Sequence, residues 1–214
     1  MLRNSVSEGR NNIPLATSSF LSPLASPLPL PIPASPGLGA WLQSQGLSLA
    51  FSTYRANRLI FLGTAEQADG ASDPDQPSEA PQLKLHERLF DRPMGLFVAG
   101  ESLWMAARCQ LWRLDNLLGP GQLHEGGDRL YVPAASFTTG DVNAHEVVLG
   151  PDGQPIFVNT AFSCLATVAQ GCSFAPTWQP PFITKLAGDD RCHLNGIALK
   201  SLRKNRLRRR VFPS

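Results

Sequence analysis

The sequence lacks long apolar runs, because polar or charged side chains interrupt every stretch of the chain. A transmembrane helix needs about 20 mainly apolar residues, so we expect no membrane span. The first residues also lack the compact apolar run and the small-residue cleavage site of a secretory signal. Without either feature, the chain is expected to be cytoplasmic.

Cysteine pairs and common catalytic motifs are missing as well. The four cysteines form no CxxC pair, so reduced core thiols are a simpler interpretation than zinc ligands or disulfides. The chain contains no GxSxG, Walker A or HExxH motif. These absences remove the usual sequence support for several enzyme classes without deciding whether the protein is an enzyme.

Two segments have compositions that do not suit a packed core. Residues 1–40 carry seven of the 19 prolines, and closely spaced prolines exclude a helix or a central strand. We expect a disordered Pro-rich leader, with a polyproline ligand for an aromatic groove as the alternative. Residues 63–82 hold five acidic residues, three prolines and no basic residue, which predicts an exposed acidic loop.

The rest of the chain is dominated by short apolar runs bounded by Gly, Asp, Asn and Pro, which is typical of strands and turns. A weak helical pattern covers only residues 40–45. The predicted strands are residues 47–54, 58–62, 95–99, 103–107, 110–114, 129–133, 146–149, 155–159 and 164–168. This pattern predicts an all-β fold.

The predicted strands recur with a period near 50 residues. Similar strand starts occur at Gly46, Gly95, Glu146 and Gly196, separated by 49, 51 and 50 residues. Such a period, with three or four short strands in each unit, is typical of β-propeller blades. A β-sandwich with accidental spacing is the alternative.

We therefore expect a partial, open β-propeller over residues 41–199, with about three blades and the first strand of a fourth. Residues 200–214 contain seven basic residues and no acidic one, which leaves 12 basic against 17 acidic residues, a net charge of −5, in the rest of the chain. We expect this basic tail to be foreign to the fold, as in a C-terminally truncated or frame-shifted copy. A solvated tail or a segment that binds anionic surfaces are the alternatives. Since the tail lacks interleaved aromatic residues, we infer no nucleic-acid partner.

Several segments resemble an uncharacterised bacterial family of conserved hypothetical proteins, regarded as propeller-like and carried as a domain of unknown function. The matching segments include FSTYRANRLIFLG at residues 51–63, QLWRLDN at 110–116, and DRCHLNG at 190–196. The others are residues 92–96, 128–133, 138–141, 157–165 and 180–183. The resemblance implies a propeller-like fold and carries no established activity, cofactor or site residue.

Polar residues beside the third and fourth repeat starts are the candidates for a functional site, because propellers bind ligands with loops and strand ends around a central channel. His145 and His193 occupy positions that the repeat treats as equivalent, so both imidazoles are expected to approach the channel from neighbouring blades. The further candidates for channel residues are Asp141, Asn143, Ser163, Asp190 and Arg191.

A metal-assisted hydrolase of the lactonase type is the more specific hypothesis. In it, Glu146, Asn159 and Asn195 supply oxygen ligands to a divalent cation such as calcium, and His145 or His193 shuttles a proton. The structural alternative is that these residues cap strand ends and satisfy buried backbone groups, which is the role we favour.

Composition and pattern therefore favour a ligand-binding or protein-interaction scaffold over a hydrolase, with a small molecule or a protein as its partner. The arginines of the predicted blades are expected to form structural ion pairs rather than to recognise a substrate. These pairs would join Arg55, Arg92 or Arg113 to Asp91, Asp115 or Asp128.

Overall fold

The computed structural model describes residues 33–64, 81–202 and 206–213, of which 200–202 and 206–213 are described by their backbone alone. The chain divides into two units, Met1–Ser35 and Pro36–Ser214, and the fold below is that of the second. Most of the expected leader (residues 1–32) and most of the expected acidic loop (residues 65–80) lie outside the described residues.

The helix α1 (Leu38–Gln45) begins two residues before the predicted one, inside the expected leader, and ends where the pattern predicts. Gly46 follows it in the left-handed conformation, with φ 59°, which glycine adopts without the steric cost of a Cβ atom. The backbone N–H of Gly46 donates to the carbonyl of Gln43, and that of Leu47 donates to Leu42. Leu42 is completely buried and anchors the helix.

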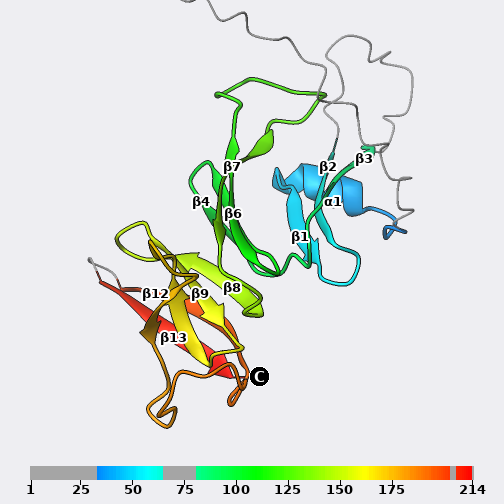
Figure 1. The fold of residues 1–214 in the computed structure, drawn as a ribbon. Coiled ribbons are helices and arrows are strands. Elements are labelled where there is room, and N and C mark those ends of the chain that lie inside the picture. Colours follow the sequence, from blue (N-terminus) through cyan, green and yellow to red (C-terminus); the bar gives the residue numbers. More distant parts are fainter. Residues whose placement is uncertain (1–32, 65–80, 203–205, 214) are drawn as a thin grey trace, which may run out of the picture. The chain divides into compact units, whose positions relative to one another are not determined.

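All described strands pair antiparallel and in sequence order, in four sheets (Figure 1). The first sheet has three strands: β1 (Leu49–Thr53), β2 (Arg58–Thr64) and β3 (Leu83–Leu89). The second has four: β4 (Leu96–Ala99), β5 (Ser102–Ala106), β6 (Gln110–Asn116) and β7 (Tyr131–Thr138). The third repeats this meander with β8 (Ala144–Leu149), β9 (Pro155–Asn159), β10 (Cys164–Thr167) and β11 (Ala175–Trp178).

The fourth sheet differs from the expectation that only a first strand is present. Strand β12 (Leu194–Leu202) pairs antiparallel with β13 (Arg206–Pro213) over most of its length. The expectation relied on the missing apolar pattern and turn residues of the basic tail. A hairpin ladder is formed by backbone groups, which every non-proline residue carries, so basic residues do not prevent it.

The first sheet is not equivalent to the first three strands of the later sheets. The N–H of Phe90, just after β3, donates to the carbonyl of Asn57, just before β2, at 2.9 Å. In the second sheet, Thr139 after β7 donates in the same way to Cys109 before β6, at 2.8 Å. Strands β1, β2 and β3 therefore match β5, β6 and β7, so the proposed repeat start at Gly46 does not mark a counterpart of β4.

The core consists of three apolar clusters, each made by two neighbouring sheets. Leu59 of the first sheet packs with Leu103 and Met105 of the second. Trp104 of the second sheet packs with Phe157 of the third. A third cluster joins the other face of the third sheet to β12, with members that include Val158 and Ile197. Each sheet is thus stabilised by burial against the next one along the chain.

The cysteines differ in their burial from the expectation. All four cysteines are free, but only Cys164 is buried, and Cys172 is exposed, so the four are not all core thiols. Burial raises the pKa of the Cys164 thiol to about 11, which keeps it protonated and unreactive at neutral pH. Within the described residues, no helix has the length and apolar character needed to cross a membrane.

Candidate functional site

The antiparallel meanders place alternate connections at the same end of the sheets. One end carries the turns before β2, β6 and β10. It also carries the connection from each sheet to the next. We call it the rim, formed by residues 54–57, 90–95, 107–109, 139–145, 160–163 and 189–195. Backbone hydrogen bonds join its parts: Arg108 donates to Asp91, Ala161 to Val142, and Asp190 to Ala161. Most of the sequence-predicted site residues lie in the rim.

Six non-glycine residues of the rim adopt the left-handed conformation, and three of them stand at matching positions. Arg92, Asn143 and His193 have φ values of 47°, 53° and 40°, and each stands three residues before one of the later repeat starts. A buried residue, Pro93, Ala144 or Leu194, follows each of them. Positive φ is uncommon outside glycine and costs of order 1 kcal/mol or more.

The two histidines meet across the third and fourth sheets. Their ring centroids are 5.3 Å apart and the rings are nearly perpendicular. Nδ1 of His145 lies 2.5 Å from Oδ1 of Asn195, and Nδ1 of His193 lies 2.6 Å from Oδ2 of Asp190. The rings meet although their positions are not equivalent, since His145 matches Asn195 and Asn143 matches His193 in the spacing of 50.

The other two candidate metal ligands have separate partners. Oε1 of Glu146 accepts the backbone N–H of Val147 at 3.2 Å. Glu146 is half-buried, and this burial raises the pKa of its carboxyl, opposed by the hydrogen bond from Val147. Oδ1 of Asn159 accepts the N–H of Phe162 at 3.0 Å. Among the residues that the structure describes, no three or more His, Cys, Asp or Glu form a group suited to a metal ion.

Asn159 has a feature that its sequence context does not reveal. The residue is completely buried, and its Nδ2 has no hydrogen-bond partner. Its neighbour Thr160, also completely buried, donates from Oγ1 to the carbonyl of Leu194 at 2.5 Å. These two side chains tie the end of β9 to the turn that follows it and to β12.

Ser163, Asp190 and Arg191 lie together where the third sheet leads into the fourth. Oγ of Ser163 accepts the backbone N–H of Arg191 at 3.0 Å. The guanidinium of Arg191 is paired instead with Asp189, at 2.9 Å. Ser163 therefore orders the connection before β12.

Asp141 and Asn143 precede His145 by four and two residues, but their contacts are with another part of the rim. Nε of Arg108 lies 2.9 Å from Oδ2 of Asp141, and its Nη1 lies 3.9 Å from Asp91. Asp141 and Asn143 line a small pocket together with Tyr54, Arg92 and Arg108. Of the candidate residues, Asn195 and Asp190 contact the imidazoles, and Asp141 and Asn143 line this pocket.

The chain matches one known protein family. A family model described as a domain of unknown function, DUF4915, matches residues 36–207. The chain belongs to the DUF4915 family. No curated protein and no solved structure matched the chain. The family agrees with the resemblance expected from the sequence, and the match spans all four sheets of the DUF4915 chain.

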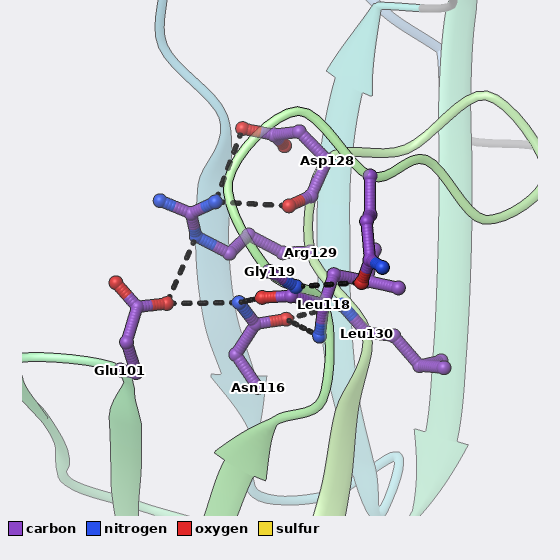
Figure 2. A network of polar contacts seen from close by, with 8 residues as sticks. Glu101, Asn116, Leu118, Gly119, Asp128, Arg129 and Leu130 are labelled. Carbon is purple, nitrogen blue, oxygen red and sulfur yellow. Dashed lines mark hydrogen bonds and ion pairs between the residues drawn. The ribbon is translucent and has the colours of Figure 1, made fainter.

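The opposite end of the DUF4915 sheets carries a polar network that sequence reasoning missed. Figure 2 shows Asn116, at the end of β6, holding both ends of the loop that leads to β7. Its Oδ1 accepts the backbone N–H groups of Leu118 and Leu130, and its Nδ2 donates to Glu101. Arg129 adds ion-pair contacts to Glu101 and Asp128. This loop is thus ordered by its own polar groups.

Pocket residues from other segments of the DUF4915 chain were also missed. Arg92 was expected to form a structural ion pair, but within the described part of the chain no carboxylate lies within ion-pair distance of it. Its guanidinium instead lies 5.6 Å from the ring centroid of Tyr54. Arg113 does pair with Asp115, at 3.2 Å. The sequence signal available for Arg92 was its position three residues before a repeat start.

Proposed function

We propose that this DUF4915 chain is a ligand-binding scaffold of propeller-like architecture, and that the rim is its binding face. The observation that carries the proposal is the matching left-handed conformation of Arg92, Asn143 and His193. Strained residues persist where the surrounding structure holds them and are found at ligand clamps more often than elsewhere. Here the same backbone device recurs in three successive connections and presents three polar side chains.

The contacts between successive sheets support a propeller-like arrangement. In a propeller the first strands of the blades lie around a common channel. The backbone N–H of Gly95, directly before β4, donates to the carbonyl of His145 in β8 at 3.0 Å. His145 in turn contacts Asn195 in β12. First strands of neighbouring sheets are thus in direct contact at the rim, as a channel mouth requires.

The close approach at Gly95 depends on the absence of a side chain. A Cβ atom added there would overlap the backbone of His145 and Glu146. Gly95 therefore lets the first strands of the second and third sheets touch, which is one of the uses of glycine in strands. This contact supports a closely packed inner row of strands below the rim.

Hydrogen exchange of the full chain tests the binding face. The chain would be incubated with a panel of small carboxylates, phosphates and neutral sugars, and amide protection would be mapped by mass spectrometry. We expect a binding compound to protect residues 90–95, 139–145 and 189–195, and to leave the loop between β6 and β7 unchanged. Protection confined to that loop, or a folded chain that binds no member of the panel, would contradict the proposal.

A metal-assisted hydrolase of the lactonase type is a second candidate, and one observation favours it. Nδ1 of each histidine is held by a side-chain oxygen, as the imidazole that acts as a general base is held in Ser-His-Asp triads. The site would require Glu146, Asn159 and Asn195 to reach a common cation. Of these, Asn195 is hydrogen-bonded to His145, whereas the oxygens of Glu146 and Asn159 accept backbone N–H groups.

Calorimetric titration of the full chain with calcium chloride tests this second candidate, with lactone hydrolysis measured in parallel. The hydrolase requires saturable calcium binding that Glu146→Gln weakens at least ~10-fold, as expected for the loss of a charged ligand. Lactone hydrolysis is also measured for the variants His145→Gln and His193→Gln. Their matched control is His86→Gln, because His86 is exposed on β3. Absence of both binding and metal-dependent hydrolysis would exclude it.

A further inference from the structure

The small pocket of the rim has a composition that the scaffold proposal does not explain. Four segments far apart in the sequence line it: the turn between β1 and β2, the connection before β4, the turn after β5, and the connection that leads into β8. Its polar lining consists of Tyr54, Arg92, Arg108, Asp141 and Asn143. Two arginines and one aspartate are thus among its lining residues.

Arg92 is held in position by three separate features. Its backbone is left-handed, with φ 47°. Its backbone N–H donates to Oδ1 of Asn57 at 2.9 Å. Its guanidinium lies over the ring of Tyr54, a cation–π contact that holds the group in one orientation. The side chain is exposed and adds nothing to the core, so packing does not account for this positioning.

Arg108 has donors to spare beside Arg92. A guanidinium carries five N–H donors, and the bond to Asp141 uses Nε. The Arg108 and Asp141 side chains are 41% and 50% exposed, and such exposed pairs contribute little to stability. Fold stability therefore explains the pair poorly, whereas a ligand oxygen could share the guanidinium with Asp141 or take its place.

We propose that this pocket binds an oxyanion group, a carboxylate or a phosphate carried by a small ligand, with Arg92 and Arg108 as the binding residues. Planar guanidinium forks match both groups. The space of about 10 Å³ that the pocket offers is that of a single water-sized group. The pocket therefore takes one end of the oxyanion, and the rest of the ligand lies over the rim. This inference rests on the proposed binding face and names its ligand class.

Calorimetric titration at constant ionic strength tests the pocket, with sodium phosphate and sodium acetate as separate probes of the full chain. We expect saturable binding of at least one probe, and the stronger of the two identifies the preferred oxyanion. Arg92→Gln is expected to weaken binding ~10-fold or more, because a charge-assisted hydrogen bond is lost. Arg92→Lys keeps the charge but loses the planar fork of the guanidinium. Its affinity should lie between those of the wild type and Arg92→Gln.

Arg55→Gln is the matched control, because Arg55 lies in the turn between β1 and β2, is exposed, and does not line the pocket. It removes the same charge without removing a pocket donor, and because exposed charges are screened by salt it is expected to change affinity less than ~2-fold. Equal losses in the two glutamine variants would show general charge attraction and overturn the proposal. Asp141→Asn supplies a gain-of-binding test, since it releases Arg108 and should raise the affinity severalfold.

The outcomes separate this proposal from the scaffold proposal. Absence of saturable binding of both probes by the folded chain overturns the oxyanion site. If a neutral ligand still protects the rim amides, and Arg92→Gln binds it as the wild type does, the scaffold proposal stands and the pocket assignment fails. If no compound protects the rim, both fail. Thermal unfolding of every variant checks that the fold is retained.

Discussion

The first and third sheets share antiparallel topology but differ in how deeply their strands are buried. Every residue of β9 in the third sheet is buried, whereas the first three residues of β1, its counterpart in the first sheet, are exposed. Strand β9 has apolar partners on both faces, from the second sheet and from β12. No described strand flanks β1 on its outer edge. Burial is thus decided by the neighbouring strands and sheets.

Truncating one phenylalanine in each sheet gives the largest expected contrast. Phe157 is completely buried in β9, while Phe51 in β1 is 36% exposed. Phe157→Ala should lower the free energy of unfolding by about 3–5 kcal/mol, because it removes apolar contacts and leaves a cavity. Phe51→Ala should lower it by less than about 1.5 kcal/mol, since part of the side chain is already in water. Urea denaturation measures both, and equal losses would refute the contrast.

Removing one threonine hydroxyl from each sheet sharpens the comparison for polar groups. Thr160→Val removes a fully buried hydrogen bond to the Leu194 carbonyl, and we expect a loss of about 1–2 kcal/mol. Thr53→Val is the matched control, because its Oγ1 bonds with Arg58 are partly buried and longer, at 3.1 and 3.2 Å. Its expected loss is about 0.5 kcal/mol. A larger loss for Thr53→Val in urea denaturation would reverse the comparison.

The smallest expected effect is the pH dependence caused by Glu146 in the third sheet. Burial raises the pKa of this carboxyl in the folded chain, so the folded state binds the proton more tightly than the unfolded state does. Its contribution to stability is complete below the ordinary pKa of glutamate and declines as the pH rises through the higher folded value. The charged form is therefore the unfavourable one at neutral pH.

Glu146→Gln stays neutral at every pH. We expect it to unfold at a higher urea concentration than the wild type at pH 7 and to lose this advantage at pH 4. The comparison of the two midpoints at the two pH values is the measurement. A difference between variant and wild type that is the same at both pH values would show that the carboxyl does not titrate in this way.

Most inner strands were predictable, because their apolar or β-branched residues are bounded by turn residues. The predicted segments at 155–159 and 58–62 agree with β9 and with most of β2. Strands β3 and β11 were missed, since they lie at the outer edges of their sheets. Charged residues in β3 and Pro176 in β11 are tolerated at such edges, which weakens the sequence pattern there.

The candidate site was predictable in part, because some of its residues lie beside the starts of the sequence repeats. A period of about 50 residues directed attention to His145 and His193, whose rings the structure brings to 5.3 Å. Tyr54, Arg92 and Arg108 come from different turns, and no spacing along the chain relates them. Only the packing of the first sheet against the second brings these turns together.

The amino-acid sequence by itself determined the all-β class, the helix, most of the strands and membership of the DUF4915 family. The all-β class, the helix and the strands follow from local periodicity and turn residues, which act over a few residues of chain. The tertiary structure alone decided which strands of different sheets are equivalent, that β13 pairs with β12, and that Arg92 and Arg108 share a pocket. These depend on hydrogen bonds and packing between distant segments, which local patterns do not encode.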